Sequence, residues 1–539
     1  MTLKAIILCA AVALAQPANG STVLPPTTEK AKANLAERGP IENLALSQLV
    51  DGIDDGALNS EAITAAYLER IAAIDDSGPM LNAVIATFPD ALEQARALDA
   101  ELKAGRYRGP MHGIPVLVKD NIEVAGPIAT TAGSLALAGN VTNRDAPLVA
   151  WLRQAGAVIL GKTNLSEWAN IRSNDSTSGW SAVGGLTKNP HALDRNACGS
   201  SSGSGAAVAA SLAAGAIGTE TDGSITCPAG VNGIVGFKPT VGLVSRRFVV
   251  PISHSQDTAG PMTRNVRDAA IMLTAMAGSD SGDSATADAD KWRGDYSSGL
   301  SVDTLKGLRI GVLRAPNVDS VLFDAALARL KEGGAELVVL DAAFIDREKL
   351  GNAEFKVLLA ELKADLAAYL QGLPSGLVQH KSLTDIIAFN KANADKELQF
   401  FNQDIFEAAE KEKGLDDPAY LEALATSKRL AAQGLDRLFA ANKVDIIIGQ
   451  TNGPAWLSTL GKGDAFSGPS ASALPAVAGY PHLTVPMGLT GGLPIGISFI
   501  GPKWHDHNVL KAGYAYETLS KARVAPTFAS ASAPPIMTK

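Results

Sequence analysis

The chain has 539 residues, of which 46% are hydrophobic and 19% are charged. This balance supports a large buried core and excludes an intrinsically disordered chain. The formal net charge is −8 and no basic tract stands out, so neither a nucleic acid nor an anionic membrane surface is an expected partner.

Residues 1–20 have the pattern of a secretory signal peptide. Lys4 is their only charged residue, an apolar stretch follows it, and Ala13-Leu14-Ala15 fits a small-x-small cleavage site. The stretch is much shorter than the ~20 residues that a membrane-spanning helix needs. We therefore expect cleavage near Ala15 and a secreted or periplasmic protein. A retained anchor, an ordinary first helix and lipidation at Cys9 are the alternatives.

The remaining sequence alternates between the periodicities of helices and strands. Helices are expected over residues 61–75, 90–105, 147–156, 203–215 and 507–521. Strands are expected over residues 113–118, 157–161, 216–221, 233–237, 308–313, 336–340, 444–449 and 493–501. This alternation predicts an α/β protein with a mostly parallel or mixed sheet.

The domain organisation expected from the sequence is simple. Residues 277–300 are rich in Gly, Ser and Asp and predict a surface loop, and residues 345–440 are mostly helical and charged. There is neither an internal repeat nor a clean linker. We expect one large domain over residues 30–525, with a helical insertion at about 345–440.

Residues that could form disulfides or bind metals are few. Loss of the signal peptide leaves Cys198 and Cys227, which do not make a disulfide framework. The two could pair, but we expect both to be free and buried. The seven histidines are scattered, and His505 and His507 fit a surface loop better than a metal site. Neither a metal nor a cofactor is expected.

A cluster of serines at residues 199–204 allows several interpretations. Gly199 to Gly203 fits G-x-S-x-G, the nucleophile elbow of serine hydrolases, but the segment before it is not the apolar strand that an elbow requires. A phosphate-binding loop would also need that strand, and a lysine after it. A flexible linker is disfavoured because a helix follows directly. The remaining interpretation is a loop at a helix start whose serines act with partners elsewhere.

A second turn, after the strand at 216–221, supplies such a partner. The strand leads into Asp222-Gly223-Ser224, which would present the Ser224 hydroxyl at the sheet edge. The N–H groups of the turn could stabilise an oxyanion. Lys119, at the end of the strand over 113–118, could be the base, because burial lowers the pKa of a lysine. Its position alone favours a structural or surface lysine over a base.

These segments resemble the amidase signature family. GSSSGSGAAVAASLAAGAIGTETDGSITCPAGVNGIVGFKPT (199–240) resembles its core signature, and GIPVLVKDNI (113–122) resembles its lysine motif. Further blocks match at 156–169 and 478–502, in the family's order. Residues 166–190 and 251–262 look most like bacterial peptide amidases. The resemblance implies a single α/β domain with a mixed central sheet covered by α-helices on both sides.

The resemblance also implies the roles of particular residues. The family's nucleophile maps onto Ser224, its bridging serine, which follows a cis peptide bond, onto Ser200, and its lysine onto Lys119. Ser201 is expected to contribute hydrogen bonds to the lysine. The oxyanion hole maps onto the backbone of Thr221, Asp222, Gly223 and Ser224. The match of Ser201 to the centre of an elbow is then accidental.

Three positions depart from the family pattern. Asp222 stands where many members have Gly, Thr226 where many have Arg, and Gln450 where Pro is common. We expect the Asp222 side chain to point away from the site while its N–H faces it. These changes put the shape of the pocket in doubt but leave the three catalytic candidates intact.

The activity that the resemblance implies is hydrolysis of an amide through an acyl-enzyme. The expected substrate is a peptide or amino-acid amide, deamidated at its C-terminal carboxamide with release of ammonia. Alternatives are aryl or fatty amides, an amidotransferase component that delivers ammonia to a charged tRNA, and a catalytically inactive binding protein. Only 5% of residues are aromatic, which speaks against a lipid substrate. The protein is expected to be a monomer or homodimer.

Overall fold

Eleven strands form one mixed sheet at the centre of the computed structural model, which describes residues 39–531. In sheet order the strands are β1 (Val84–Thr87), β3 (Val158–Thr163), β2 (Pro115–Lys119), β8 (Gly215–Glu220), β10 (Thr258–Thr263), β9 (Val235–Lys238), β14 (His482–Thr490), β15 (Leu493–Ile500), β13 (Ile446–Gln450), β11 (Arg309–Val312) and β12 (Glu336–Val339). The expected signal peptide lies outside the described residues.

The order of the strands explains why the sheet is mixed. β2 runs parallel to both β3 and β8, and β11 runs parallel to β12 and β13. Antiparallel pairs join these two parallel groups through β10, β9, β14 and β15. Every residue of β2 is buried, as is typical of a central parallel strand with both faces covered.

Two short antiparallel pairs lie apart from the main sheet. They are β4 (Trp180–Ser181) with β5 (Gly185–Leu186), and β6 (Lys188–Asn189) with β7 (Ala192–Asn196). Both pairs belong to the segment that leads from β3 to the serine cluster, so this segment is ordered by hydrogen bonds before it reaches Ser200.

Helices cover both faces of the sheet, as predicted. On one face, a side chain at Gly215 would meet Met272 of α8, and Leu483 of β14 lies against α17. On the other face, a side chain at Gly218 would meet Ser201 and Ile225, which lie at the starts of α6 and α7. Gly215 and Gly218 are three residues apart, so they point to opposite faces. The predicted fold class is confirmed.

The helices have the following bounds. They are α2 (Leu46–Asp54), α3 (Ser60–Ile74), α4 (Ala91–Lys103), α5 (Pro147–Gln154), α6 (Ser202–Ala209), α7 (Thr226–Val231), α8 (Val266–Met276), α9 (Ala289–Trp292), α10 (Ser320–Glu332), α11 (Arg347–Gln371), α12 (Leu383–Ala392), α13 (Ala394–Glu397), α14 (Asp404–Ala409), α15 (Pro418–Asn442), α16 (Ala473–Ala478) and α17 (Asp506–Ser520). None of the helices among residues 39–531 is long and apolar enough to cross a membrane.

The small residues of α6 let this helix approach the sheet closely. All of its residues are buried. A side chain at Gly203 would come within 2.2 Å of the Ala83 carbonyl oxygen and 2.5 Å of the Asn164 carbonyl oxygen, so only glycine fits there. The close approach places the serines before α6 against the ends of the neighbouring strands.

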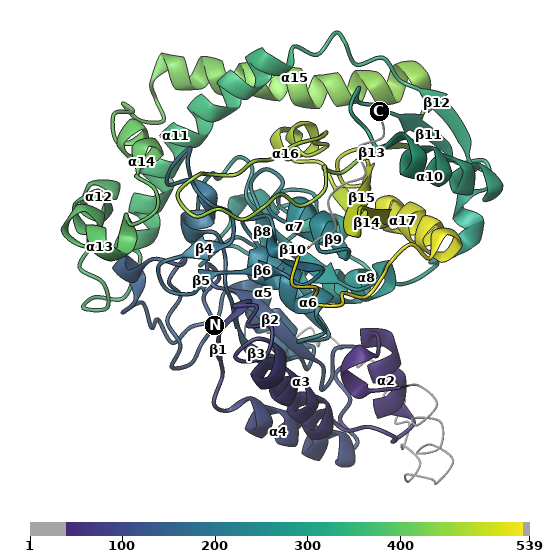
Figure 1. The fold of residues 1–539 in the computed structure, drawn as a ribbon, viewed down its shortest axis with the longest axis horizontal. Helices are drawn as coiled ribbons and strands as arrows, with labels where there is room; N and C mark the ends of the chain where they lie inside the picture. The colour runs from purple at the N-terminus through teal and green to yellow at the C-terminus, as the bar shows by residue number, and fades with distance from the viewer. Residues whose placement is uncertain (1–38, 532–539) are drawn as a thin grey trace, which may run out of the picture.

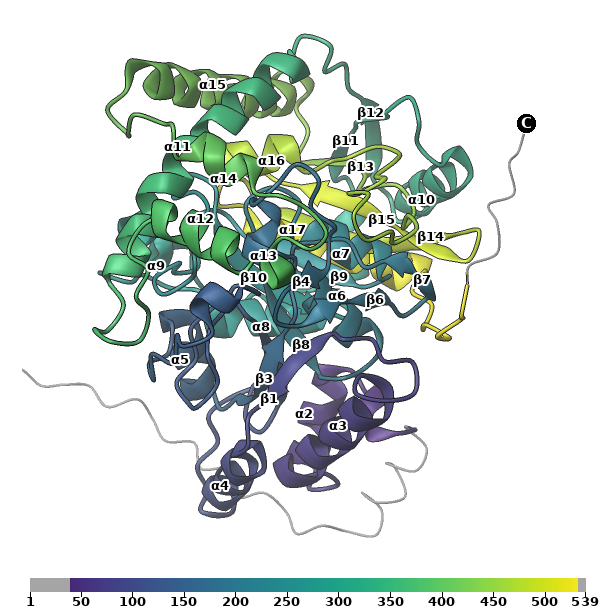
Figure 2. The ribbon, with the colours of Figure 1, turned by 60° about the vertical axis from the view of Figure 1, so that its left-hand side comes forward.

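The region from 345 to 440 forms a helical layer on one side of the sheet. In Figures 1 and 2 the long helices α11 and α15 lie side by side, with α12 and α14 next to α11 and α13 next to α12. Leu362 and Leu366 of α11 and Phe406 of α14 share a hydrophobic cluster with Trp168 and Val250, which belong to loops beside the sheet. The helical region is therefore anchored on loops that, as shown below, adjoin the candidate site.

Three strands of the main sheet were not expected from the sequence: β1, β10 and β14. β10 contains Gly260 and Pro261, and β14 contains Pro486 and Gly488. Proline and glycine lower the strand propensity of a sequence, so local pattern alone does not reveal β10 and β14. Their pairing with neighbours across the sheet determines their conformation.

Candidate active site

Two neighbouring parallel strands bring the candidate residues to one edge of the sheet. Lys119 is the last residue of β2, and Glu220 is the last residue of β8, which pairs with β2 in parallel. The turn that carries Ser224 follows β8 directly. Because parallel strands end at the same edge, residues about 100 positions apart in sequence become neighbours.

Lys119 is fully buried and contacts a serine. Its Nζ lies 2.7 Å from the Ser200 Oγ and 2.8 Å from the Thr219 Oγ1, and its side chain has 0% exposure. Burial lowers its pKa to about 7, against the opposing effect of the negative charges of Asp257 and Glu220. A substantial fraction of Lys119 is therefore neutral near pH 7, and a neutral amine can accept a proton.

The backbone around Ser200 holds this serine in place. The peptide bond between Gly199 and Ser200 is cis, as the resemblance implied. The Ser200 carbonyl oxygen accepts a hydrogen bond from the N–H of Ser166 at 3.0 Å. A side chain at Gly199 would come within 2.1 Å of the Ser166 Oγ, so this position has no room for any residue but glycine.

Ser201 joins the serine loop to the turn that carries Ser224. Its N–H donates to the Ser224 carbonyl oxygen at 3.1 Å. Its hydroxyl bonds the backbone of Thr219, at 3.1 Å to the carbonyl oxygen and 3.2 Å to the nitrogen. This differs from the direct bond to Lys119 that we expected. Thr219 lies between the two side chains, so Ser201 supports the lysine indirectly.

A disulfide between Cys198 and Cys227, with Cα atoms 6.0 Å apart, links the two segments that carry the candidate serines. The prediction that both cysteines are free is therefore wrong. The sequence separation of 29 residues gave no sign of the pairing. Cys198 lies two residues before Ser200 and Cys227 three residues after Ser224, so the fold that assembles the site also brings the two thiols together.

The turn after β8 leaves backbone donors free for a ligand. The Glu220 carboxylate accepts hydrogen bonds from the N–H groups of Ile225 and Thr226 at 2.8 and 2.9 Å. In contrast, none of the hydrogen bonds between described residues uses the N–H groups of Asp222, Gly223 or Ser224. Gly223 has a φ of 78°, in the left-handed region. Unpaired N–H groups on such a turn can receive a developing negative charge.

The carboxyl group of Asp222 is turned toward the helical region. It contacts the hydroxyl of Ser472 and the carboxyl group of Glu354 on α11. Thr221, the preceding residue, donates from its hydroxyl to Asp257 at 2.6 Å. The turn is thus held from outside by side chains that lie far away in the sequence.

A cavity of about 430 Å³ adjoins these residues. Asn121, Thr219, Thr221 and Asp257 line one wall, and residues 246–252, His254 and α11 form other walls. The Asn121 side chain donates to the Thr219 Oγ1 at 3.0 Å, so the wall shares its hydrogen bonds with the lysine. The lining includes Thr219 and Thr221 but none of the three catalytic candidates, Lys119, Ser200 and Ser224.

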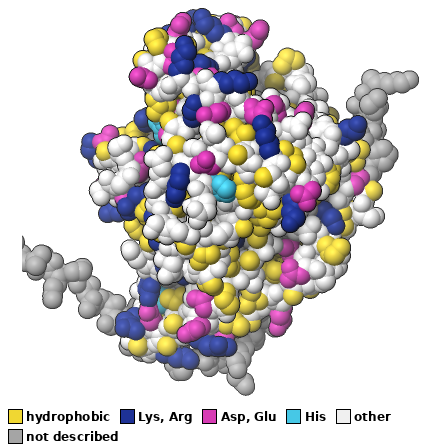
Figure 3. Space-filling view, turned by 90° about the vertical axis from the view of Figure 1, so that its left-hand side faces the viewer, with side chains coloured by type: hydrophobic (Ala, Val, Ile, Leu, Met, Phe, Trp, Pro, Cys, Tyr) yellow, Lys and Arg dark blue, Asp and Glu magenta, His cyan; other side chains and the backbone are white. Residues whose placement is uncertain are grey.

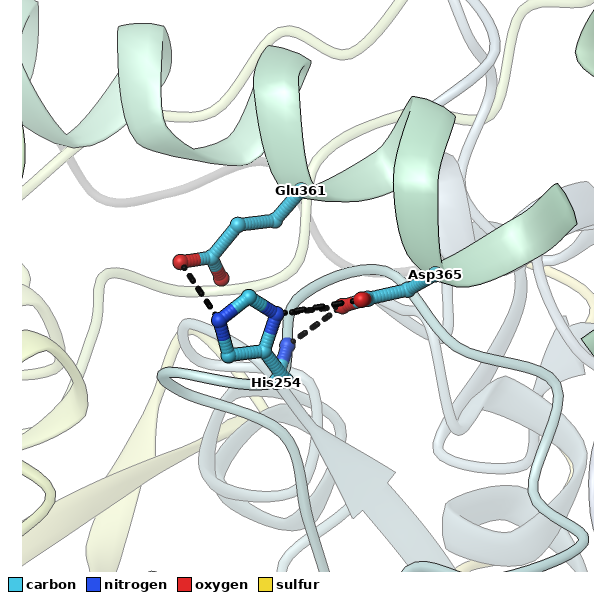
Figure 4. Close-up of side chains that lie close together, drawn as sticks. All are labelled: His254, Glu361 and Asp365. Carbon is cyan, nitrogen blue, oxygen red and sulfur yellow. Dashed lines mark hydrogen bonds and ion pairs between the residues drawn. The ribbon is translucent and has the colours of Figure 1, made fainter. Parts of the chain in front are cut away.

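His254, Glu361 and Asp365 form a charged cluster at the rim of this cavity. Figure 4 shows the two carboxylates of α11 on opposite sides of the imidazole ring. Nδ1 lies 2.9 Å from an Asp365 oxygen, and Nε2 lies 3.3 Å from a Glu361 oxygen. The hydrogen bond to Asp365 raises the pKa of His254. Although the three residues are close enough to share a metal ion, each ring nitrogen faces a different carboxylate, which is the geometry of an ion-paired histidine.

One face of the surface carries a mixture of charges. In Figure 3, which shows the left-hand side of Figure 1, basic and acidic side chains are interspersed, and hydrophobic side chains gather between them. This face does not show the large basic patch that binding to a nucleic acid requires.

The fold and this site define a class of protein: an α/β enzyme with a buried lysine, a serine after a cis peptide bond and a second serine on a turn. The chain matches the model of the amidase family over residues 62–510 and therefore belongs to this family. It is an amidohydrolase that acts on amides.

Three relatives of known name or structure are similar to this chain over most of its length. The peptide amidase of Stenotrophomonas maltophilia is 49% identical, with a TM-score of 0.87 and coverage of 91% of this chain and 99% of that one. A probable amidase of Arabidopsis thaliana is 39% identical over 90% of this chain and 92% of its own length. A component of the glutamyl-tRNA(Gln) amidotransferase of Moorella thermoacetica is 36% identical over 88% of this chain and 96% of its own length.

Several residues of the site were not identified from the sequence. Thr219 and Asn121 surround the lysine, Asp257 holds the turn, and Glu354 contacts Asp222. Asn121 and Asp257 lie inside the sequence blocks that resemble the family, which was the available signal. Glu354 lies in the helical region, and its sequence context gave no signal.

Proposed function

We propose that the protein is a serine amidohydrolase in which Ser224 is the nucleophile, Ser200 relays the proton and Lys119 is the base. The contact of 2.7 Å between the Lys119 Nζ and the Ser200 Oγ carries this proposal. The lowered pKa of Lys119, about 7, supports a base that is neutral at working pH. The backbone carbonyl of Ser224 accepts a hydrogen bond from the N–H of Ser201, which holds Ser224 next to the loop that carries Ser200.

The reaction proceeds through an acyl-enzyme. Lys119 accepts a proton from Ser200, and Ser200 accepts one from Ser224, whose oxygen forms a bond to the amide carbon. The N–H groups of Asp222, Gly223 and Ser224 stabilise the tetrahedral oxyanion, an effect in which loss of one donor typically costs ~10²–10³ in rate. The relay then returns the proton to the leaving nitrogen, the C–N bond breaks, and ammonia departs. Water hydrolyses the ester by the same route.

The substrate that we propose is the C-terminal amide of a peptide or of an amino acid. The identity of 49% to a peptide amidase supports this choice over other acyl amides. The similarity to a component of an amidotransferase, at 36% identity, keeps ammonia transfer as the second candidate. Transfer to tRNA would require a cytoplasmic location, which the export pattern at residues 1–20 disfavours.

The test is incubation of the mature protein with an N-acylated dipeptide amide, the matching free acid, an anilide and a fatty amide. Mass spectrometry follows conversion of amide to acid. Deamidation of the peptide amide with its internal bond intact is the expected result. Reaction of the anilide or the fatty amide instead would refute the proposal that the substrate is a peptide amide. Ser224→Ala should lower turnover by roughly 10⁴-fold or more. The surface variant Ser298→Ala is the control. An active Ser224→Ala variant would show that Ser224 is not the nucleophile.

A further inference from the structure

Asp222, which stands beside the unpaired N–H groups of the turn, meets a second carboxyl group. That group belongs to Glu354 of α11, which lies beside Asp222, and none of the hydrogen bonds found between described residues reaches the buried Asp222 Oδ1. Glu354 is only 7% exposed. Two carboxylates in contact repel each other strongly in a buried site, so the pair retains a proton that one of them donates to the other.

Gln256 provides a second link between α11 and the same turn. Its side-chain amide donates to the Glu354 Oε1 at 2.9 Å and to the Thr221 carbonyl oxygen at 3.3 Å. Glu354 therefore reaches the turn at two successive residues, Thr221 and Asp222. The Oε1 that accepts from Gln256 leaves the other oxygen of Glu354 to carry the shared proton.

The surroundings determine which carboxyl group holds the proton. Burial raises the pKa of Asp222, but the neighbouring Ser472 hydroxyl and the positive charge of buried Lys238 both lower it and so favour a carboxylate there. The negative charge of Glu220 acts in the opposite direction. Burial raises the pKa of Glu354, and the nearby Asp222 raises it further. The proton therefore resides on Glu354, and Asp222 carries the charge.

We propose that Glu354 is a positioning residue for the nucleophile turn. As a neutral acid it donates a hydrogen bond to Asp222, and so holds the turn while limiting the pair to one negative charge. A second charge at this place would oppose the oxyanion that forms at the neighbouring N–H groups. This inference rests on the proposed function. It also explains why an aspartate can stand at position 222, where glycine is common in the family: Glu354 of the helical region donates a hydrogen bond to its carboxylate.

The test compares the pH dependence of kcat for the wild type and three variants from about pH 5 to about pH 10, with an amide that the wild type hydrolyses. The wild type should lose activity at alkaline pH as the shared proton dissociates. Glu354→Gln, whose amide still donates to Asp222 but cannot ionise, should keep activity near neutral pH and lack this alkaline decline. Glu354→Ala, which removes the donor that α11 supplies to Asp222, should lower kcat by roughly tenfold with little change in KM. Glu348→Gln, an exposed position on the same helix, is the matched control.

Two outcomes would overturn the proposal. One is an alkaline decline that is the same in Glu354→Gln as in the wild type, and the other is an unchanged kcat in a folded Glu354→Ala variant. Infrared spectroscopy adds a readout that needs no substrate: the wild type should show a protonated carboxylic acid that titrates at alkaline pH and is missing in Glu354→Gln. If the wild type hydrolyses no amide, the proposed function fails, and the infrared band still decides whether the carboxyl pair shares a proton.

Discussion

At the scale of single residues, the chemistry of the site depends on burial. Lys119 has no exposed surface, and its Nζ is surrounded by the oxygens of Ser200 and Thr219. An exposed lysine would be almost entirely protonated near pH 7, whereas burial lowers the pKa of Lys119 to about 7. A lysine is thus a cation when it is exposed, whereas the buried Lys119 is an amine that can accept a proton.

The pH dependence of the reaction tests this role. Only the neutral form of Lys119 can accept a proton, so kcat/KM should rise with pH through about 7 and fall roughly tenfold per unit below it. Lys119→Met should be severely impaired and should lack this titration. The measurement is the pH profile of kcat/KM for the proposed substrate. A profile that stays flat well below pH 7 would show that Lys119 is not the base.

At the scale of elements, contacts between segments hold the site together. The disulfide between Cys198 and Cys227 connects the loop of Ser200 to α7. Further along, the segment 253–257 is held against α11, because the Ser255 hydroxyl donates to Glu361 at 2.6 Å and the N–H of His254 donates to Asp365 at 2.8 Å. These links connect the turn of Ser224 to segments that precede and follow it.

Removal of the disulfide should destabilise the protein. A cross-link that closes a loop of 29 residues stabilises the fold by about 3 to 4 kcal/mol in the chain-entropy description. The double variant Cys198→Ala, Cys227→Ala should therefore unfold at lower urea concentration than the wild type. Thiol titration of the unfolded, unreduced mature protein should detect no free cysteine. Detection of two free thiols would contradict the pairing.

The cluster around His254 should make stability depend on pH. The hydrogen bond to Asp365 raises the pKa of His254 in the folded state above its ordinary value of 6.5, with the charge of Glu361 acting in the same direction and that of Arg246 opposing it. The stabilisation is complete below pH 6.5 and is lost as the pH rises through the raised pKa. The difference in unfolding free energy between the wild type and His254→Gln should therefore shrink from acidic to mildly alkaline pH. An unchanged difference would contradict the ion pair, and His505→Gln is a control on a separate loop.

At the scale of the whole molecule, the sheet brings together segments that are remote in sequence. β2 and β8 supply the lysine and the turn, and the helical region of α11 to α15 supplies Glu354, Glu361 and Asp365. A mixed sheet allows this, since its parallel groups place several strand ends at one edge while antiparallel strands extend it.

We propose that the protein is exported and that its signal peptide is removed. The pattern at residues 1–20 and the disulfide both favour an oxidising compartment. Expression of the full chain in a bacterial host should place the protein in the periplasm or medium, with a mature N-terminus near Gln16. Intact-mass measurement and N-terminal sequencing check this. A cytoplasmic protein that retains residues 1–20 would refute it, and deletion of these residues is the control.

Local patterns were sufficient to predict much of the molecule. The strand before Lys119 was predicted from its apolar run, and the turns around Ser200 and Ser224 were predicted from their glycines and serines. Such predictions succeed because strand periodicity and turn chemistry act over a few residues. The strands β10 and β14 escaped prediction because Pro261 and Pro486 weaken the local signal, and only pairing with neighbours makes them strands.

The sequence by itself determined the α/β class through its periodicity, and its motifs, which resemble those of the amidase signature family, indicated the family and the three residues that we propose for catalysis. Only the tertiary structure decided that Cys198 and Cys227 are bonded, that Ser201 supports Lys119 through Thr219, and that Glu354 meets Asp222. These contacts join segments that lie far apart along the chain. Burial and proximity, and with them pKa values and disulfide pairing, arise from the packing of the whole chain and have no local pattern that would reveal them.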